Sequence, residues 1–207
     1  MAYYYHIDEQ GQQSWTNGLV DVQLAARPFA EGALRAAYAM RVFGSNGEHL
    51  CVCKMAKAVE HAKHTHHFAD VAMQAHAQWW ARRFNEHHPP KQVFFIDAFA
   101  VQLLDRAGQP VHAAEPRIEG AYVKHSDNAG YVNAEQVRNT PHAFSHFTLE
   151  ASNRQLVIVD IQGVNDLYTD PQVHTADGHG FGVGNLGMVG IQKFMETHRC
   201  NSICQYL

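Results

Sequence analysis

The sequence of 207 residues contains no uninterrupted apolar run that approaches the roughly 20 residues needed to cross a lipid bilayer. The first ten residues, MAYYYHIDEQ, lack the basic stretch and apolar run of a secretion signal. Basic charge is not in excess either, because 16 lysines and arginines stand against 20 aspartates and glutamates. Duplex binding depends on a basic surface that neutralises phosphates. We therefore expect a cytoplasmic protein that neither inserts into membranes nor binds nucleic acid as its main partner.

Cysteine is scarce, and its four residues form two pairs, Cys51 with Cys53 and Cys200 with Cys204. Without a secretion signal, such pairs more often ligate a metal or lie buried as thiols than form disulfides. Apolar residues are plentiful at 46%, enough for one domain or two closely packed lobes. Of the 16 histidines, most are expected on the surface or in packing roles, including four at 61–67, before the first expected long helix.

The first half of the chain is predicted to be rich in strands. Short apolar runs alternate with turn signals over residues 17–56, which indicates an antiparallel meander, and Leu50–Met55 has period-two character. Helical spacing predicts an amphipathic helix over 68–84, ended by Pro89-Pro90. Further strands are expected at 93–104 and around 118–123.

The second half is predicted to be mixed. A helix is expected at 134–149, where Pro141 should either kink it or start a second helix. A buried strand at 156–159, a long loop at 163–187 and a helix at 188–197 follow, and a loop of that length is usually functional. The order predicts an α+β fold with an N-lobe of about residues 1–116, a C-lobe of about 117–207 and a hinge near 115–120.

Two carboxylates and a carboxamide follow the expected buried strand. Asp160 and Gln162 should leave the strand end on one face, at the rim of the sheet, where open sheets tend to hold ligands. Asp170 follows in the sequence YTDP. Oxygen ligands of this kind suit magnesium bound to nucleotide phosphates. On spacing alone, Asp160 and Asp170 could instead be cap or turn residues, and a turn is the default for Asp170 because a proline follows it.

Lys54 lies inside a predicted strand, flanked by Val52 and Met55. Its ammonium group either extends to water, which is the default, or meets an anion. A phosphate-binding role follows only if Lys54 faces the acidic residues across a cleft. Arg35, in the sequence PFAEGALR, adds a cation that can bind phosphate through two hydrogen bonds, a weak signal by itself. The sequence GVGNLG at 182–187 resembles a phosphate cradle, but no strand is expected before it, which excludes a dinucleotide-binding motif.

The sequence HRCNSIC near the C-terminus is the clearest metal-binding pattern. In a helix, Cys200 and Cys204 would share one face, and His198 could join them only if the helix bends or begins anew near Arg199. Three such ligands leave one position in a tetrahedral zinc site, for which His146 is a candidate. The alternative is that the two thiols pack in the core. A site with four protein ligands would be structural, whereas an open site could hydrolyse a substrate.

The segment DIQGVNDLYTDPQVHT at 160–175 resembles the signature of the alpha-kinase family, which includes myosin heavy chain kinases, elongation factor two kinase and kinases fused to ion channels. Further matches are Lys54, PPKQV at 89–93, IEGAY at 118–122, AFSHFT at 143–148, GNLG at 184–187 and HRCNSIC at 198–204. Together they extend from about residue 20 to 204. Asn165 stands where many members have glycine, and asparagine tolerates positive φ better than most residues. The resemblance implies a two-lobed protein-kinase-like fold with a nucleotide between the lobes, without the HRD and DFG motifs of conventional kinases.

The resemblance also implies which residues bind the nucleotide. Lys54 matches the lysine that contacts the ATP phosphates, and Arg35 matches an arginine on the nucleotide side. Glu115 and Ile118 match hinge residues whose backbone groups hold the adenine, and Tyr122 lines the same pocket.

Metal ligands and catalytic groups are implied in the same way. Gln162 and Asp170 match the magnesium ligands, and Asp170 also matches the catalytic carboxylate. Asp160 matches an aspartate that can itself carry phosphate in the family. Asn185 matches a loop near the phosphates and the peptide. The matches to the ligands of a closed, structural zinc site are His146, His198, Cys200 and Cys204.

We therefore expect a protein serine/threonine kinase that uses ATP, Mg²⁺ and Zn²⁺ and phosphorylates Thr or Ser of a protein substrate. The resemblance is also compatible with regulatory domains, or a calmodulin-type regulator, outside this chain. One alternative is a nucleotide-binding pseudokinase or adaptor, whose mark would be loss of Lys54, Asp160 or Asp170, and all three are present. Another is a zinc hydrolase, which needs an open coordination position and a general base.

Overall fold

The computed structural model describes residues 1–32, 34–44, 47–58, 63–136 and 138–206. They group into two compact units. Unit 1 comprises Met1–Ala75 and Asp97–Arg117, and unit 2 comprises His76–Ile96 and Ile118–Leu207. The sequence-based expectation treated residues 1–116 as one continuous lobe, whereas residues 76–96 group with the second unit. His61, one of the four clustered histidines, lies outside the described residues, as does residue 137 of the expected helix at 134–149.

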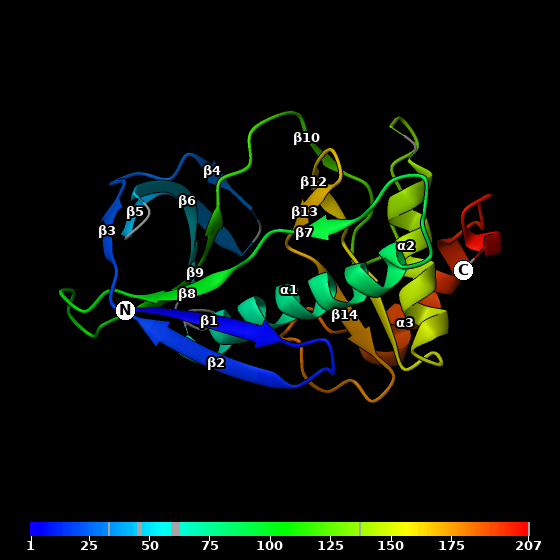
Figure 1. Cartoon of the computed structure of the whole chain (residues 1–207), viewed down its shortest axis with the longest axis horizontal. Coiled ribbons are helices and arrows are strands. Elements are labelled where there is room, and N and C mark those ends of the chain that lie inside the picture. The colour runs from blue at the N-terminus through cyan, green and yellow to red at the C-terminus, as the bar shows by residue number, and fades with distance from the viewer. Residues whose placement is uncertain (33, 45–46, 59–62, 137, 207) are drawn as a thin grey trace. The chain divides into compact units, whose positions relative to one another are not determined.

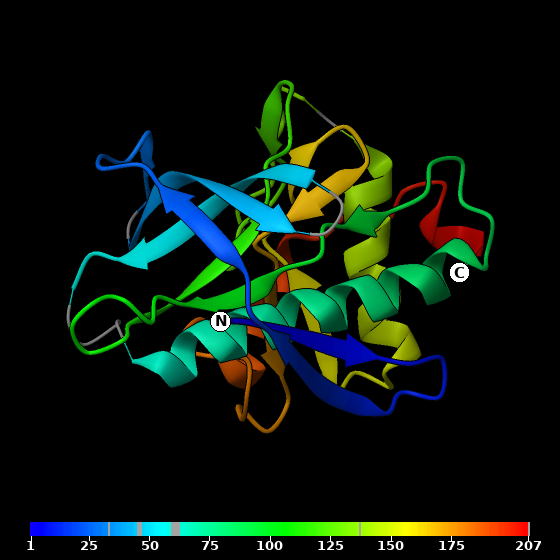
Figure 2. The ribbon, with the colours of Figure 1, turned by 60° about the vertical axis from the view of Figure 1, so that its left-hand side comes forward.

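Unit 1 contains an antiparallel sheet with the strand order β2-β1-β8-β9-β6-β5-β3, and β4 pairs with β5 (Figure 1). The strands are β1 Ala2–Ile7, β2 Gln13–Gly18, β3 Asp21–Leu24, β4 Ala30–Glu31, β5 Arg35–Gly44, β6 Gly47–Ala56, β8 Phe99–Gln102 and β9 Val111–Pro116. The long β5–β6 hairpin confirms the meander expected over residues 17–56 (Figure 2). The alternation predicted for Leu50–Met55 is also correct, since Cys51 and Cys53 lie in the core and Met55 packs against it.

Strand β9 was not predicted. Its sequence, VHAAEP, contains two alanines and ends in proline, and these residues have low strand propensity, so the local signal is weak. It forms because it lies between β6 and β8 in the sheet. The strand expected around 118–123 is β10, Tyr122–Lys124, in unit 2.

Helix α1 spans His64–Asn85 and therefore begins four residues before the predicted start at Phe68. Three of the clustered histidines, which were expected to precede the helix, lie in its first turn. Among them His67 is almost fully buried, at 1% exposure, and its ring packs edge to face against His112. The helix ends at Asn85, whose side-chain amide donates to the Val93 carbonyl and accepts from the Val93 N–H, both at 2.9 Å.

His67 makes the stability of unit 1 sensitive to acid. Burial, reinforced by the nearby charges of His112 and Arg35, lowers the pKa of His67 from 6.5 to about 4. Between these two values the unfolded chain binds a proton that the folded chain does not. Stability is therefore expected to fall as the pH decreases from about 6.5 towards 4, and the contribution should be absent above that window.

Replacing His67 with phenylalanine should remove this dependence, because phenylalanine fills the same space and does not titrate. The difference in unfolding free energy between pH 7 and pH 4.5 should shrink by about 2 kcal/mol, measured by urea denaturation at both pH values. His49→Gln, at an exposed position of β6 in the same unit, is the matched control and should leave the difference unchanged. An equal pH dependence in His67→Phe and the unmodified protein would show that His67 is not the group that titrates.

Unit 2 contains two small sheets and two helices that pack on one of them. The first sheet has the order β10-β12-β13-β7, in which β13 and β7 are parallel, and the second pairs β11 with β14. Helix α2 packs on β11, and helix α3 packs on β14 and β11 (Figure 1). The elements are β7 Phe94–Phe95, β11 Leu156–Val159, β12 Gln162–Val164, β13 Leu167–Thr169, β14 Gln172–Thr175, α2 Asn139–Ala151, α3 Gly187–Thr197 and the short 3₁₀ helix η2 Cys204–Tyr206.

The strand predicted at 156–159 and the helix predicted at 188–197 are confirmed. Helix α2 begins at Asn139, so Pro141 lies in its first turn, where a missing N–H costs nothing. The loop expected at 163–187 is wrong in its first part, which contains β12, β13 and β14. Strands of three or four residues are too short to show a period of two, and turn residues dominate the segment. Likewise, the single strand expected at 93–104 is two short strands, β7 and β8, in different sheets.

The core of unit 2 holds β11 and β14 against α3. Leu149, Val157, Val159 and Ile191 form one cluster, each less than 5% exposed. Gly190 lets helix α3 approach β14, because a Cβ at this position would lie 2.4 Å from the ring of His174. None of the helices in the described part of the chain has the length and apolar character that a membrane-spanning helix requires.

Candidate active site

Lys54 lies on β6 in the middle of the unit 1 sheet, opposite Ala37 of β5 and Ala113 of β9. Its ammonium Nζ lies 2.7 Å from the Oε1 atom of Glu115, and the two side chains are only 11% and 9% exposed. Because Val52 is opposite Glu115, Lys54 and Glu115 are diagonal neighbours on adjacent strands. Lys54 therefore meets an anion instead of extending to water. The resemblance implied only a backbone role for Glu115, and its carboxylate was not expected to contact Lys54.

Arg35 begins strand β5, and its guanidinium NH2 lies 2.7 Å from the Oδ2 atom of Asp70 on α1. Both side chains are partly covered, at 31% and 15% exposure. The arginine is thus held in place by a carboxylate that the sequence analysis did not single out. Ile118 is half-buried between β9 and β10, and Tyr122 is 52% exposed at the start of β10.

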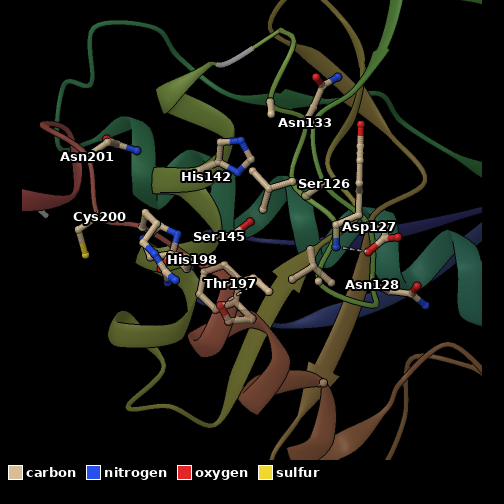
Figure 3. A pocket seen from close by; sticks show the side chains of 18 of the residues that line it. Ser126, Asp127, Asn128, Asn133, His142, Ser145, Thr197, His198, Cys200 and Asn201 are labelled. Atoms are coloured by element: carbon tan, nitrogen blue, oxygen red, sulfur yellow. Dashed lines mark hydrogen bonds between the residues drawn. The ribbon is translucent and has the colours of Figure 1, made fainter.

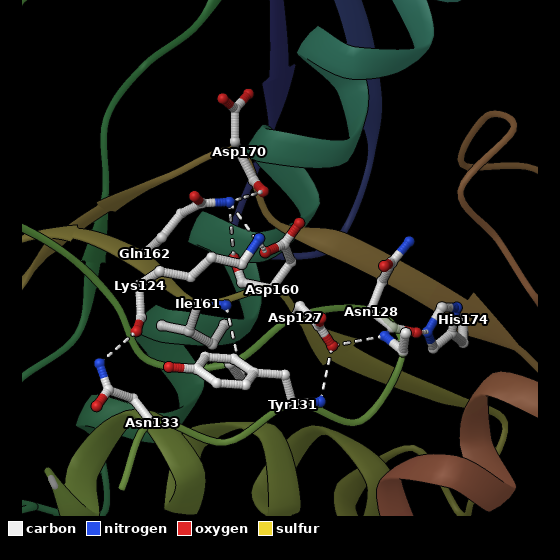
Figure 4. A network of polar contacts seen from close by, with 12 residues as sticks. Lys124, Asp127, Asn128, Tyr131, Asn133, Asp160, Ile161, Gln162, Asp170 and His174 are labelled. Carbon is white, nitrogen blue, oxygen red and sulfur yellow. Dashed lines mark hydrogen bonds and ion pairs between the residues drawn. The ribbon is translucent and has the colours of Figure 1, made fainter. Parts of the chain in front are cut away.

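In unit 2, Asp160, Gln162 and Asp170 come together at the ends of β11, β12 and β13 (Figure 4). The Gln162 amide Nε2 donates to the Asp160 carboxylate at 3.0 Å and to the Asp170 carbonyl at 3.4 Å. Because Nε2 is used in this way, the Gln162 Oε1 faces away and can accept a hydrogen bond or ligate a cation. Figure 4 shows that the Asp170 carboxylate extends away from the amide. The prediction that Asp160 and Gln162 leave the strand end together is confirmed.

Positive φ angles give this edge its shape. Asp160 has φ 58°, Asn165 has φ 55° and Asp170 has φ 51°, in the left-handed region that aspartate and asparagine enter more readily than most residues. At Asp160 the conformation ends β11 and turns the side chain to the rim. At Asn165 it explains why the family's glycine can be replaced by asparagine. At Gly163, a Cβ would lie 2.2 Å from the Leu167 carbonyl, so the β12–β13 turn requires glycine.

Lys124 supplies positive charge to this edge, and the sequence analysis did not identify it. Its Nζ lies 2.7 Å from the Oδ1 atom of Asp160, and Lys124 is directly opposite Gln162 in the β10–β12 pair. Burial raises the pKa of Asp160, whereas the hydrogen bond and charge of Lys124 lower it. Lys124 therefore favours the ionised form of the Asp160 carboxylate. The sequence did offer one indication of Lys124, because this lysine lies two residues after the IEGAY segment that matches the family.

Asn185 organises the loop between β14 and α3. Its Oδ1 accepts the N–H groups of Thr175 and Gly187 at 3.1 and 2.9 Å. Its Nδ2 donates to the Thr175 hydroxyl at 2.8 Å and to the carbonyls of His179 and Gly180 at 3.2 Å. The side chain thus ties both ends of the loop together. A role beside phosphate or peptide stays a prediction.

The four residues expected to bind zinc come together at the end of α3. The Nδ1 atom of His146 on α2 lies 3.0 Å from Nε2 of His198. Cys200 Sγ lies 3.5 Å from His146 Nδ1, and Cys204 Sγ lies 3.7 Å from His198 Nε2. All four ligand atoms are within 4.8 Å of one another. A tetrahedral zinc ion with these ligands separates them by about 3.3 to 3.8 Å, so the donor set and spacing fit a closed zinc site.

The local conformation of this tail differs from the prediction. Cys200 and Cys204 do not share a helical face, because α3 ends at Thr197 and η2 begins at Cys204. The chain reverses between them, which brings the two thiols to the histidines. Burial, with a further contribution from His146, lowers the pKa of His198 to about 4, so its ring is neutral at pH 7, as metal ligation requires.

A cavity of about 380 Å³ lies within unit 2, and His198 and Cys200 of the His/Cys cluster are among the residues that line it. One wall is the turn at 126–134, and the opposite walls are α2, α3 and the tail at 198–201 (Figure 3). Ser126 and Asp127 of the turn, His142 and Ser145 of α2, and His198 of the tail line it. The turn therefore has open space on one side where packed side chains would otherwise support it.

The chain matches the model of the alpha-kinase family over residues 30–204. It is 44% identical over 204 residues to myosin heavy chain kinase C of Dictyostelium discoideum and 43% identical over 197 residues to eukaryotic elongation factor 2 kinase of Mus musculus. These matches cover 97% and 92% of this chain but only 26% and 27% of those proteins. The alpha-kinase domain of myosin heavy chain kinase A, crystallised with ADP, is 38% identical with a TM-score of 0.90, covering 99% of this chain and 94% of that one. The fold is therefore the mixed α+β, kinase-like fold of those domains, and the chain belongs to the alpha-kinase family.

Proposed function

We propose that this chain is the catalytic domain of an ATP-dependent protein kinase that phosphorylates serine or threonine. The observation that carries the proposal is the group formed by Asp160, Gln162 and Asp170 at one edge of unit 2, in a chain that belongs to a family of protein kinases. That a related domain was crystallised with ADP supports a nucleotide as the ligand.

Four residues would bind the nucleotide, namely Arg35, Lys54, Glu115 and Ile118. The buried ammonium of Lys54 is suited to contact the ATP phosphates, because the ion pair with Glu115 holds it in one position. Arg35, held by Asp70, would supply a second cation on the nucleotide side. The backbone groups of Glu115 and Ile118 would hold the adenine.

Residues of unit 2 would carry out the transfer. Gln162 Oε1 and the Asp170 carboxylate would hold magnesium, whose charge offsets that of the phosphates. Asp170 would also orient the Ser or Thr hydroxyl of the protein substrate and accept its proton. The hydroxyl oxygen bonds to the γ-phosphorus, the bond from that phosphorus to the β,γ-bridging oxygen breaks, and ADP leaves with the electron pair. Tyr122 would line the adenine pocket, and Asn185 would shape the loop near the phosphates and the peptide.

We also propose that His146, His198, Cys200 and Cys204 hold a structural zinc ion. Four protein ligands fill a tetrahedral shell and leave no position for a substrate or water. This favours a structural role over a zinc hydrolase. The free thiols of Cys51 and Cys53, buried in unit 1, suit the reducing cytoplasm, which we propose as the site of action.

The function is tested by incubating the purified protein with radiolabelled ATP, magnesium and a generic basic protein. We expect label in the acceptor protein and at least about a hundredfold less with Lys54→Met. That variant breaks the buried ion pair with Glu115, which costs about 3 to 5 kcal/mol of stability. The double variant Lys54→Met with Glu115→Gln removes both charges, so it should recover stability without recovering activity.

Three outcomes separate the candidate functions. Label in the acceptor that is lost in the double variant supports the kinase. Nucleotide binding without transfer by the unmodified protein would identify a pseudokinase. Transfer that persists in a stably folded double variant would contradict the proposed role of Lys54.

A further inference from the structure

The peptide groups on both sides of Ile161 are held by two consecutive residues that lie far away in the sequence. The Ile161 N–H donates to the hydroxyl of Ser126 at 3.1 Å. The Ile161 carbonyl accepts the N–H of His125 at 2.8 Å and that of Ser126 at 3.4 Å. Ile161 is fully buried and Ser126 is 8% exposed, so water does not readily replace these bonds. The hydroxyl of Ser126 takes the place of a strand partner where β11 has ended.

Ile161 is the residue between Asp160 and Gln162, so its peptide groups set the direction of both side chains. Asp160 has φ 58°, a conformation that a residue with a Cβ adopts only when its surroundings compensate the cost. The peptide that follows Asp160 is the one whose N–H donates to Ser126. Loss of that bond would let this peptide rotate, and the Asp160 carboxylate and the Gln162 amide would change direction with it.

The turn that carries Ser126 is positioned by polar contacts. The Asp127 carboxylate accepts the N–H groups of Ala129 and Tyr131, both at 2.8 Å. The Asn128 carbonyl lies 3.0 Å from Nε2 of His174 on β14 (Figure 4). His174 Nδ1 accepts the N–H of Leu186. A cavity of about 380 Å³ adjoins the turn and is lined by Ser126, Asn128 and His174, so these bonds contribute to placing Ser126 where packing is incomplete (Figure 3).

We propose that Ser126 is a positioning residue for the active-site edge, and that its hydroxyl fixes the Ile161 peptide and thereby aims Asp160 and Gln162. The proposal rests on the proposed kinase function. Asp160 and Gln162 need a fixed direction only if they act on phosphate and magnesium. Ser126 is not among the residues proposed to bind the substrate or the metal. Its effect should resemble that of other groups that orient metal ligands, whose loss typically lowers metal affinity or activity by about 10- to 100-fold.

Thr148 provides a matched control. Its hydroxyl accepts the N–H of Ile158 at 3.0 Å, so the same kind of bond holds strand β11 two residues before Asp160. Thr148 is also fully buried. Thr148→Val and Ser126→Ala each remove one buried hydroxyl that accepts a backbone N–H, but only Ser126 holds the peptide between the proposed active-site side chains.

The experiment compares kcat, the KM for the acceptor protein and the magnesium concentration for half-maximal rate in these variants. We expect Ser126→Ala to lower kcat and to raise the magnesium requirement by about 10-fold or more, with the acceptor KM unchanged. Ser126→Thr, which keeps the hydroxyl, should restore both, and Thr148→Val should change neither. If Ser126→Ala does not fold, Ser126→Cys replaces it and should lower kcat in the same direction, because a thiol is a weaker acceptor.

A second readout is independent of activity. Exchange of the Ile161 amide hydrogen should accelerate in Ser126→Ala while that of Ile158 does not, and the reverse should hold in Thr148→Val. Equal losses of kcat in Ser126→Ala and Thr148→Val would overturn the proposal and reduce Ser126 to a stabilising residue. An inactive unmodified protein would contradict the proposed kinase function instead, while unchanged exchange at Ile161 in Ser126→Ala would still refute the positioning role.

Discussion

Asp170→Asn is expected to lower phosphoryl transfer to a generic basic protein by about a thousandfold or more while leaving the thermal unfolding of the protein unchanged. Asparagine keeps one oxygen and the shape of aspartate but removes the negative charge, and with it the capacity to accept the hydroxyl proton and to bind magnesium strongly. Both losses slow the same step, the phosphoryl transfer. The decrease in rate should therefore lie at the upper end of the range found for general acid–base side chains.

Asparagine is a better replacement here than alanine. Asp170 has φ 51°, which asparagine adopts more readily than alanine, so loss of activity cannot be attributed to a changed backbone. The rate of label transfer from ATP and the melting temperature are the two measurements. Asp177→Asn is the matched control, because Asp177 is 71% exposed in the loop after β14 and its backbone-binding oxygen is retained. More than a tenth of the original activity in Asp170→Asn would exclude the catalytic role.

Cys200→Ser with Cys204→Ser is expected to abolish zinc binding and to unfold the part of unit 2 that surrounds the tail. Structural zinc sites in small peptides contribute about 10 to 16 kcal/mol, which is comparable to the entire stability of a typical domain. The reversed tail of residues 198–204 has little regular structure of its own, and the ligands His146 and His198 connect it to α2 and α3. In the double variant, two histidines and two serine hydroxyls would lie close together without a metal ion to link them.

Elemental analysis should find one zinc per chain in the unmodified protein and none in the double variant, whose circular dichroism spectrum should lose part of its helical signal. Cys51→Ala is the control for loss of a thiol, because Cys51 is buried in unit 1, at 4% exposure, far along the chain from the cluster. This variant should keep one zinc per chain even if packing is weakened. A zinc-free unmodified protein that melts cooperatively at an ordinary temperature would disprove a structural zinc site.

The sequence alone determined those features that are encoded in short continuous segments. The alternation around Lys54, the apolar strand at 156–159 and the helix at 188–197 are local patterns, and the structure contains each of them. The residues at 160–175 and 198–204 were recognisable as a family signature. Proximity of Asp160 to Gln162 followed directly from their spacing at a strand end.

Only the tertiary structure decided which side chains act on these groups. Glu115 reaches Lys54 because β9 pairs with β6, and Lys124 reaches Asp160 because β10 pairs with β12. Ser126 reaches the Ile161 N–H across 35 positions of sequence. Strands β9, β10 and β12 are short or carry weak strand formers, so their pairing is stabilised by neighbouring strands more than by local preference. Buried charges and buried N–H groups need partners, and here those partners come from segments that are distant in the sequence. Packing of the whole unit brings these segments together, so no local sequence pattern predicts the pairs.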